Sequence, residues 1–232
     1  MFRRLSRFGR SAERLVRVLA FDCCGDAMAA GVGDVDGGQV TMLAEDCSAS
    51  TARHAERLVP MIVDMVKAAG CGFDAIDLLA VTCGPGSFTG IRTCVAAARG
   101  IALAGGIPIM PMTTLEVMAA GRGSGGAFRV IMDGRRNRLF VQDFSDPFTA
   151  EGEAASLDHA AFATLRGTGS QRPVLGFGGE PAMMGASAMI RLAAVRMERG
   201  AVPIAGTSLL PFYLNPPDAR KSAGQSLLHR SA

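Results

Sequence analysis

The pattern of apolar and polar positions divides the first part of the chain into short strands and one long helix. Apolar runs bounded by turn residues predict strands at 18–22, 27–33 and 40–44, joined by tight turns as an antiparallel meander. The segment 51–69 repeats apolar residues at intervals of three and four and predicts a helix with one face in the core. The chain therefore opens with a small sheet and a helix that covers it.

A buried strand and an alanine-rich helix follow, separated by a glycine-rich turn. The strand is predicted at 76–82 and the helix at 88–104. Ser87 is expected to cap the helix, because its hydroxyl accepts a hydrogen bond from a free N–H of the first turn. The turn is the first candidate site, since the free amides and the helix dipole of such a unit commonly bind anions.

The second half predicts shorter elements of both kinds. Strands are expected at 107–110, 128–133, 139–144 and 174–177, and helices at 113–120, 157–165 and 181–197. The domain boundaries predicted from these elements are an Arg-rich extension at 1–17, a first α/β domain at 18–105, and a second α/β domain with a proline-rich tail at 106–232.

Both long helices carry apolar residues on more than one face. In the first helix, Leu58, Met61 and Met65 lie beside the stripe that faces the core. Two stripes indicate either deep burial or a docking surface, and methionine is common in adaptable docking surfaces. From the residue pattern alone, core and docking surface are equal alternatives.

The net charge of +3 is unevenly distributed along the chain. Residues 1–17 hold six arginines and one glutamate, a charge of +5, which leaves −2 for the remainder. A broad nucleic-acid-binding face is therefore not expected on the folded body. Arg135, Arg136 and Arg138 gather at a predicted hairpin tip. They either contact RNA or an acidic partner or belong to a solvated turn, and the solvated turn is the favoured interpretation. The Arg-rich start is likewise expected to be a solvated extension or an early start codon rather than a targeting or nucleic-acid-binding arm.

The cysteines and histidines give no metal-site spacing. Six cysteines contain no C-x-x-C pair, and only three histidines are present. Reduced, buried thiols in a cytoplasmic protein are expected, and no apolar run is long enough for a membrane span. Asp22 stands at the end of the first strand, where a metal–phosphate ligand and a turn cap are alternatives and the cap is favoured.

The glycine-rich turn does not match two common catalytic loops. Gly90 is followed by Ile91 and Arg92, whereas a Walker A loop requires lysine there. Ser87 stands at the wrong position for a G-x-S-x-G nucleophile elbow, and Phe88 occupies the place of its last glycine. Nucleophilic catalysis is not expected from so few histidines.

Several segments of the chain match one known family. They are His54, Leu58-Val59-Pro60, the run from Asp77 to Arg92 with its turn Gly84-Pro85-Gly86-Ser87-Phe88-Thr89-Gly90-Ile91-Arg92, then Ile107-Pro108, Thr114-Leu115-Glu116, Asp133-Gly134-Arg135 and Phe212-Tyr213-Leu214. In these segments the chain resembles the TsaB (YeaZ) family, the non-catalytic partner subunits of the bacterial machinery that makes threonylcarbamoyladenosine in tRNA. The similarity is strong over residues 18–120 and thinner afterwards.

The resemblance implies an actin-like ATPase (ASKHA) fold of two α/β subdomains with mixed sheets and flanking helices. It also implies a heterodimer with the catalytic TsaD subunit, association with the ATPase TsaE, and docking through helices 51–69 and 88–104. A homodimer that uses the same helices is a further possibility. The expected interface residues are His54, Arg57, Leu58, Met61, Met65, Arg92, Val95 and Arg99.

Two departures from catalytic relatives favour a scaffold without its own turnover. Related catalytic subunits carry a His-x-x-x-His metal pair where this chain has Thr114 and Met118. The first-strand turn Asp22-Cys23-Cys24 also lacks the usual phosphate-binding residues. We therefore expect no cofactor here, ATP and metal on partner subunits, tRNA contact only through the complex, and no membrane association. A small-molecule kinase or a metallopeptidase-like hydrolase of the same fold is the alternative. The turn at Gly84, Pro85, Gly86, Ser87, Thr89 and Gly90 is then an architectural joint that positions the docking helix.

Overall fold

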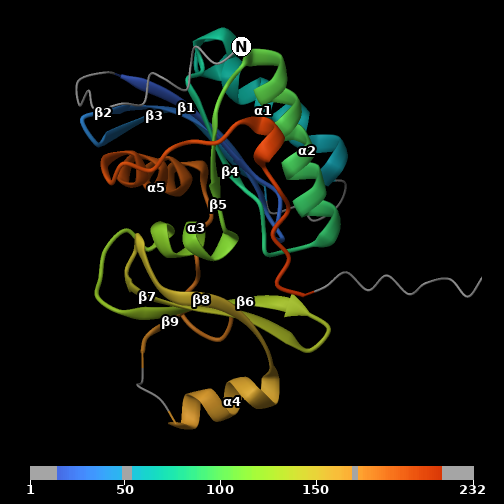
Figure 1. Cartoon of the computed structure of the whole chain (residues 1–232), viewed down its shortest axis with the longest axis vertical. Helices are drawn as coiled ribbons and strands as arrows, with labels where there is room; N and C mark the ends of the chain where they lie inside the picture. The colour runs from blue at the N-terminus through green and yellow to red at the C-terminus, as the bar shows by residue number, and fades with distance from the viewer. Residues whose placement is uncertain (1–14, 49–53, 169–171, 216–232) are drawn as a thin grey trace, which may run out of the picture.

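The computed structural model describes residues 15–48, 54–168 and 172–215 and contains two lobes, each built on one β-sheet (Figure 1). The five-stranded sheet of the upper lobe has the order β3-β2-β1-β4-β5, and the four-stranded sheet of the lower lobe has the order β8-β7-β6-β9. Both sheets are mixed and both carry helices. The predicted architecture of two α/β subdomains with flanking helices is therefore confirmed.

The upper sheet combines the predicted meander with two parallel strands. Strand β1 pairs antiparallel with β2, and β2 pairs antiparallel with β3. On its other edge β1 pairs parallel with β4, which pairs parallel with β5. The strands are β1 (Val16–Asp22), β2 (Met28–Asp36), β3 (Gln39–Ser48), β4 (Leu78–Thr82) and β5 (Ile109–Met112).

Helices cover both faces of the upper sheet (Figure 1). Because successive strand residues point to opposite faces, Leu19 and Phe21 of β1 face α1 (His54–Ala68) and α2 (Phe88–Gly105). Val18 and Ala20 face α5 (Ala186–Glu198) on the other side. All four side chains are fully buried. Burial on both faces explains why β1 and β4 are continuous apolar runs rather than alternating ones.

Helix α3 (Thr114–Gly121) lies between the two sheets and packs against both lobes (Figure 1). Val117 and Ala120 join the core beneath α5, while Leu115 and Met118 join the core of the lower sheet. The lower sheet carries α4 (His159–Thr168) on its other face. Its strands are β6 (Phe128–Arg135), β7 (Arg138–Asp146), β8 (Thr149–Asp158) and β9 (Val174–Gly176), and two short 3-10 turns occur at Phe73–Ala75 and Gly206–Ser208.

The arrangement corrects the predicted domain boundaries. Strand β5 lies after residue 105 yet belongs to the upper sheet, and α5 returns from the second half of the chain to cover that sheet. Strand β1 begins at Val16, so Arg17 belongs to the sheet and pairs with Asp34 instead of forming part of an extension. Residues 1–14 of the predicted Arg-rich extension lie outside the described residues.

Among the helices of the described residues, none combines the length and apolar character needed to span a bilayer.

Candidate functional site

The turn that joins β4 to α2 is held in one shape by glycine geometry and by a helix cap. Gly84 has a φ of +115°, a left-handed conformation that favours glycine, and its bond to Pro85 is cis. The Gly90 backbone N–H donates to the Ser87 side-chain oxygen at 3.0 Å, so Ser87 caps α2 as predicted. A Cβ atom at Gly90 would lie 2.1 Å from the carbonyl oxygen of Cys23, which leaves no space for a larger residue.

The same turn is bonded to three distant parts of the chain. The backbone N–H groups of Ser87, Thr114 and Phe212 donate to the carbonyl oxygens of Cys24, Gly84 and Cys83, at 2.7, 2.8 and 2.7 Å respectively. Gly86 lies close against the Cys24 carbonyl, and Thr89 is exposed in the first turn of α2. The turn is therefore the place where the end of β1, the start of α3 and the C-terminal segment meet.

Asp22 uses its carboxylate inside this joint. The side chain is buried, and its Oδ1 accepts from the Cys24 backbone N–H at 3.0 Å and from the Thr82 hydroxyl. The N–H groups of Cys24, Ser87 and Gly90 all have partners within the joint. Because a phosphate needs such amides free, the geometry fits an architectural joint better than an anion cradle.

The buried thiols around the joint are in environments that favour the neutral form. A hydrogen bond with Cys94 and burial raise the pKa of Cys24 well above its ordinary value, and burial raises that of Cys94. Burial also raises the pKa of Cys83 to about 11. Because the thiolate is the reactive form, these cysteines are weak nucleophiles at neutral pH.

One grouping of polar side chains was not predicted from the sequence. Ligand atoms of Asp22, Cys24 and Cys94 lie within 4.8 Å of one another. The Thr82 hydroxyl contacts all three: it donates to Asp22 and lies 3.3 Å from Cys24 Sγ and 3.7 Å from Cys94 Sγ. Local spacing gives no signal for this grouping, since its members come from β1, β4 and α2. Because the Thr82 hydroxyl contacts all three residues, the grouping is a hydrogen-bonded polar network within the core.

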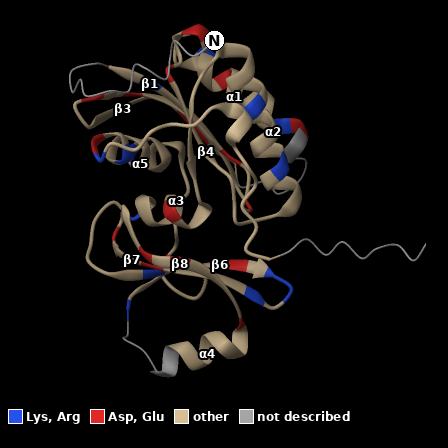
Figure 2. Ribbon diagram, in the orientation of Figure 1, with Lys and Arg blue, Asp and Glu red and all other residues tan. Residues whose placement is uncertain are grey.

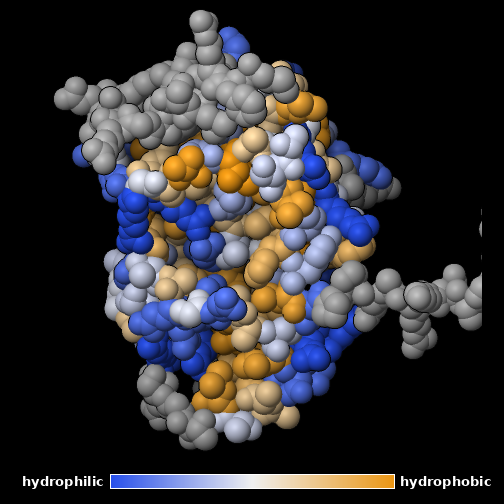
Figure 3. All heavy atoms as spheres, viewed as in Figure 1, coloured by the Kyte–Doolittle hydropathy of each residue, from blue (hydrophilic) through white to orange (hydrophobic). Residues whose placement is uncertain are grey.

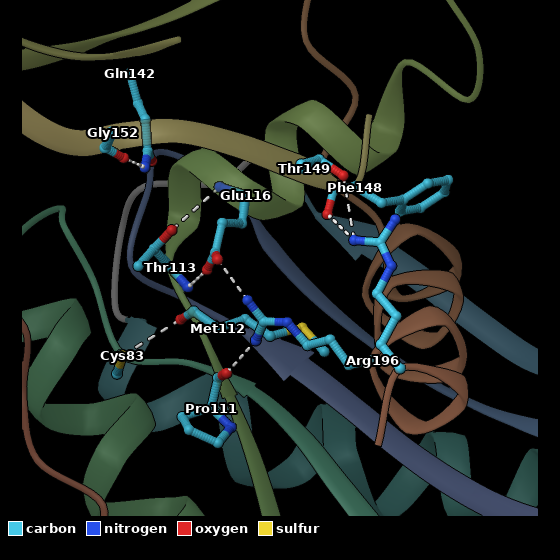
Figure 4. A network of polar contacts seen from close by, with 11 residues as sticks. Cys83, Pro111, Met112, Thr113, Glu116, Gln142, Phe148, Thr149, Gly152 and Arg196 are labelled. Carbon is cyan, nitrogen blue, oxygen red and sulfur yellow. Dashed lines mark hydrogen bonds and ion pairs between the residues drawn. The ribbon is translucent and has the colours of Figure 1, made fainter. Parts of the chain in front are cut away.

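Helix α3, where the resemblance places a metal-binding histidine pair in catalytic subunits, forms a structural connection here. Thr114 and Met118 are both buried. The Thr113 N–H donates to Glu116 Oε2 at 2.7 Å, and the Glu116 N–H donates to Thr113 Oγ1 at 3.2 Å, which completes a capping box. Figure 4 shows Arg196 of α5 reaching the same Glu116 carboxylate. The polar side chains at the start of α3 therefore fasten this helix to α5 of the upper lobe, while Leu115 and Met118 pack against the lower sheet.

A small cavity lies where the two lobes meet at the tip of the β6–β7 hairpin. Arg135 forms an ion pair with Asp26 at 2.8 Å across its edge, and both side chains are exposed. Arg136 and Arg138 are also exposed. Of the three hairpin arginines, Arg135 therefore joins the two lobes, while Arg136 and Arg138 have exposed side chains. The lining includes Gly25, Asp26, Gly86, Asp133, Arg135 and Phe140.

Several residues expected at a partner interface lie in the core of the chain itself. Leu58, Met61 and Val95 are 0%, 8% and 4% exposed. They belong to the cluster that joins α1, α2 and the upper sheet, and half-buried Met65 packs against it. The prediction that the side chains of Leu58, Met61 and Val95 face a partner is therefore wrong, whereas for Met65 it stays a prediction. The second apolar stripe of each helix is explained by packing of α1 and α2 against each other.

The charged residues of the same prediction are on the surface. Arg57, Arg92 and Arg99 are exposed, and His54 begins α1 but its side chain lies outside the described ones. The sequence reasoning missed the exposed apolar residues of this region. Helical spacing places five exposed residues on one side of α2, and we call this set the α2 face: Phe88, Arg92, Ala96, Arg99 and Leu103.

A stack of three side chains forms the N-terminal end of the α2 face. The guanidinium carbon of Arg92 lies 3.8 Å from the centre of the Phe88 ring. Tyr213, from the C-terminal segment, stacks on Phe88 with ring centres 5.7 Å apart. Arg92 Nε donates to the Tyr213 hydroxyl at 3.3 Å. The exposed arginine is therefore fixed in orientation by two aromatic residues.

Comparison with known proteins gives one family and several relatives. Residues 48–171 match the family model described as TsaD, tRNA N6-adenosine threonylcarbamoyltransferase. An uncharacterized protein of Mycobacterium leprae is 33% identical over 59% of this chain and 38% of its own length. The tRNA threonylcarbamoyladenosine biosynthesis protein TsaB of Escherichia coli is 32% identical over 56% of this chain and 55% of its own length. The chain thus matches about half or less of the length of these two relatives.

Solved structures agree with the fold. YeaZ from Pseudomonas aeruginosa superposes with a TM-score of 0.68 at 22% identity, over 86% of this chain and all of that one. The two-lobed α/β architecture expected from the sequence is confirmed by this match and by the two-sheet topology.

Proposed function

This chain belongs to the TsaD family and, within it, to the TsaB (YeaZ) group, and we propose that it is a non-catalytic partner subunit in the making of threonylcarbamoyladenosine in tRNA. Two relatives, the TsaB proteins of Escherichia coli and Haemophilus influenzae, are named for that biosynthesis, which supports the proposal. In the proposed role it binds the catalytic TsaD-type subunit and makes the complex competent. The TsaE-type ATPase and tRNA then associate with the assembled complex, and ATP and metal bind to the partner subunits.

The observation that carries the proposal is the α2 face. Leu103 is 66% exposed and Phe88 is 43% exposed, whereas Ile91, Val95 and Ala98 on the other side of this helix are buried. Val59 on the neighbouring α1 is 49% exposed. Figure 3 shows orange and blue atoms interspersed over this part of the upper lobe. Apolar side chains exposed among polar ones are typical of surfaces that bind another protein.

The chemistry of the joint supports a role without turnover. The Asp22 carboxylate is buried and bonded to Thr82 and the Cys24 amide. The thiols of Cys24 and Cys94 have raised pKa values, and Glu116 is engaged by Arg196. These groups are the candidates for acid, base or nucleophile in the joint, and their contacts are all internal. No specific observation favours a kinase or a hydrolase of the same fold.

Co-purification tests the proposed binding. The chain is co-expressed with the TsaD-type subunit of the same genome and examined by size-exclusion chromatography. The wild-type chain is expected to elute with the catalytic subunit. The double variant Val59→Asp, Leu103→Asp is expected to remain folded, because both side chains are exposed, and to elute alone.

A matched control keeps this test specific. Phe177 and Met183 are 46% and 73% exposed and lie away from the helix pair, so Phe177→Asp with Met183→Asp introduces the same charges at similar exposure. This control is expected to co-elute like the wild-type chain. Co-elution of the Val59, Leu103 variant, or turnover of ATP or peptide by the isolated chain, would refute the proposal.

A further inference from the structure

The α2 face is cationic as well as apolar. Helix α2 contains Arg92 and Arg99 and no aspartate or glutamate. Both arginines are exposed, and Figure 2 shows blue but no red along this helix. In contrast, the charges of the described side chains of α1 cancel, because Glu56 and Asp64 are matched by Arg57 and Lys67. The positive charge of the helix pair is therefore concentrated on α2.

Both arginines are held in place by the C-terminal segment. Arg92 Nε donates to the Tyr213 hydroxyl and the guanidinium lies over Phe88, and these two contacts do not use its two terminal nitrogens. Arg99 Nη2 donates to the Thr207 carbonyl oxygen at 3.4 Å. A guanidinium that is already oriented loses less conformational freedom on binding and is suited to a bidentate contact with a carboxylate.

We propose that the partner presents carboxylate side chains, set among apolar residues, opposite Arg92 and Arg99. This inference rests on the proposed function, because it specifies the chemistry of the surface that the α2 face binds. Arg92 on its aromatic platform is the anchor of the contact, and Tyr213 is a positioning residue that acts through Arg92. The apolar residues Phe88, Ala96 and Leu103 supply the contact area around the two charges.

The same charges disfavour two other occupants. A second copy of this chain, related by a two-fold axis that packs α2 against α2, would bring four arginines together with no acid on either helix to pair them. Nucleic acid is disfavoured because two arginines among apolar side chains are too few for a phosphate-binding surface. An acidic protein surface satisfies both the charge and the apolar character of the α2 face.

The test measures affinity for the purified TsaD-type subunit by titration calorimetry. Arg92→Gln and Arg99→Gln are each expected to raise the dissociation constant about tenfold, because each leaves a partner carboxylate unpaired. Arg138→Gln, an exposed arginine on the lower lobe, is the control and is expected to bind as wild type. The wild-type affinity is expected to fall as sodium chloride is raised from about 50 to about 500 mM, and that of the double arginine variant to change much less.

A second variant separates positioning from folding. Tyr213→Phe retains the ring that stacks on Phe88 and removes only the oxygen that accepts from Arg92. Tyr213→Phe is expected to raise the dissociation constant about threefold. In the double variant with Arg92→Gln it is expected to add nothing to the effect of Arg92→Gln alone. Charge reversal, Arg92→Glu with Arg99→Glu, is expected to abolish binding.

The outcomes distinguish the inference from the proposed function. A stable complex whose affinity is unchanged by the arginine variants and by salt would overturn the inference and leave the proposed subunit role intact. Two other outcomes would also overturn the inference. If the wild-type chain sediments as a homodimer that the two arginine substitutions dissociate, the partner is a second copy. If the isolated chain retains tRNA and the substitutions abolish this, the partner is nucleic acid. Failure of the wild-type chain to bind the catalytic subunit at all would overturn both.

Discussion

Arg129 and Asp143 face each other across β6 and β7 and are joined by two parallel hydrogen bonds, from Nε to Oδ1 at 2.6 Å and from Nη2 to Oδ2 at 2.8 Å. The hydrogen bond from Arg129 holds the pKa of Asp143 below its ordinary value. A carboxyl group with a lowered pKa stabilises the fold above its unfolded pKa of about 4, and this contribution disappears as the pH falls through the folded pKa.

This pair predicts a pH-dependent stability difference. Asp143→Asn is expected to lower the free energy of unfolding by about 1 kcal/mol at neutral pH, a modest value because the pair is partly exposed to solvent. The difference should shrink as the pH falls below the unfolded pKa of about 4, and should disappear once the pH is below the lowered pKa of Asp143 in the folded protein, because the wild-type carboxylate is then protonated. Urea unfolding at several pH values measures it. Glu153→Gln, at an exposed carboxylate with no described ion pair, is the control, and a difference that persists at low pH would contradict the assignment.

The cap of α2 predicts a local stability effect. Ser87→Ala removes the acceptor for the Gly90 N–H and is expected to cost about 1 kcal/mol in urea unfolding. Ser87→Asp provides another capping oxygen and should retain most of the wild-type stability. Equal losses for the two variants would show that the serine acts through something other than its capping bond.

Two glycines of α2 predict opposite outcomes for the same substitution. Gly90→Ala places a methyl group against the Cys23 carbonyl oxygen and is expected to destabilise the protein by about 3 kcal/mol. At Gly100 an added Cβ meets no atom within 4 Å, so Gly100→Ala is expected to stabilise by up to about 1 kcal/mol. Thermal unfolding of the two variants side by side checks this, and a neutral Gly90→Ala would refute the close approach of α2 to the first-strand turn.

Burial predicts which side of the helix pair tolerates charge. Met61→Asp is expected to unfold the protein or to cost more than about 3 kcal/mol, since the residue is 8% exposed in the upper core. Leu103→Asp, at 66% exposure, should leave the stability within about 0.5 kcal/mol of wild type. Circular dichroism and urea unfolding measure both. A stable Met61→Asp variant would restore the prediction that this side of α1 faces outward.

Thiol accessibility predicts an order of labelling. Cys47 is exposed, whereas Cys23, Cys24, Cys83 and Cys94 are buried. A maleimide or disulfide reagent at pH 8 is expected to modify Cys47 first and the four buried thiols only on unfolding, because they are inaccessible and the pKa of Cys83 is raised to about 11. Mass spectrometry of peptides gives the order. Rapid labelling of Cys24 in the folded protein would contradict the described core.

The sequence predicted most elements of the fold, because their signals are local. The strand–turn–helix unit and the Ser87 cap depend on residues a few positions apart. Strand β8 was missed, since Thr149–Asp158 is rich in alanine and glutamate, residues that are uncommon in strands, and lies at the edge of its sheet. Its pairing with β7 is what makes it a strand.

The site was harder to predict because it depends on distant contacts. A second apolar stripe has the same sequence pattern whether it packs against a neighbouring helix of the same chain or against a partner. In the structure Leu58 and Val95 lie in the core between α1, α2 and the sheet. The stack of Phe88 and Arg92 with Tyr213 joins residues more than a hundred positions apart, so no spacing rule indicates it. Polar network residues such as Thr82 and Cys94 are likewise brought together only by the fold.

The return of the chain to its first lobe has a consequence for biosynthesis. Sheet β1–β5 is complete by residue 112, yet α5 covers one of its faces and Leu209 enters the core on the other. A ribosome therefore releases all strands of the upper lobe, together with α1 and α2 that cover one face, long before α5 that covers the other face. Until α5 emerges, one apolar face of the sheet lacks its cover, and the nascent chain is open to chaperone binding during that interval.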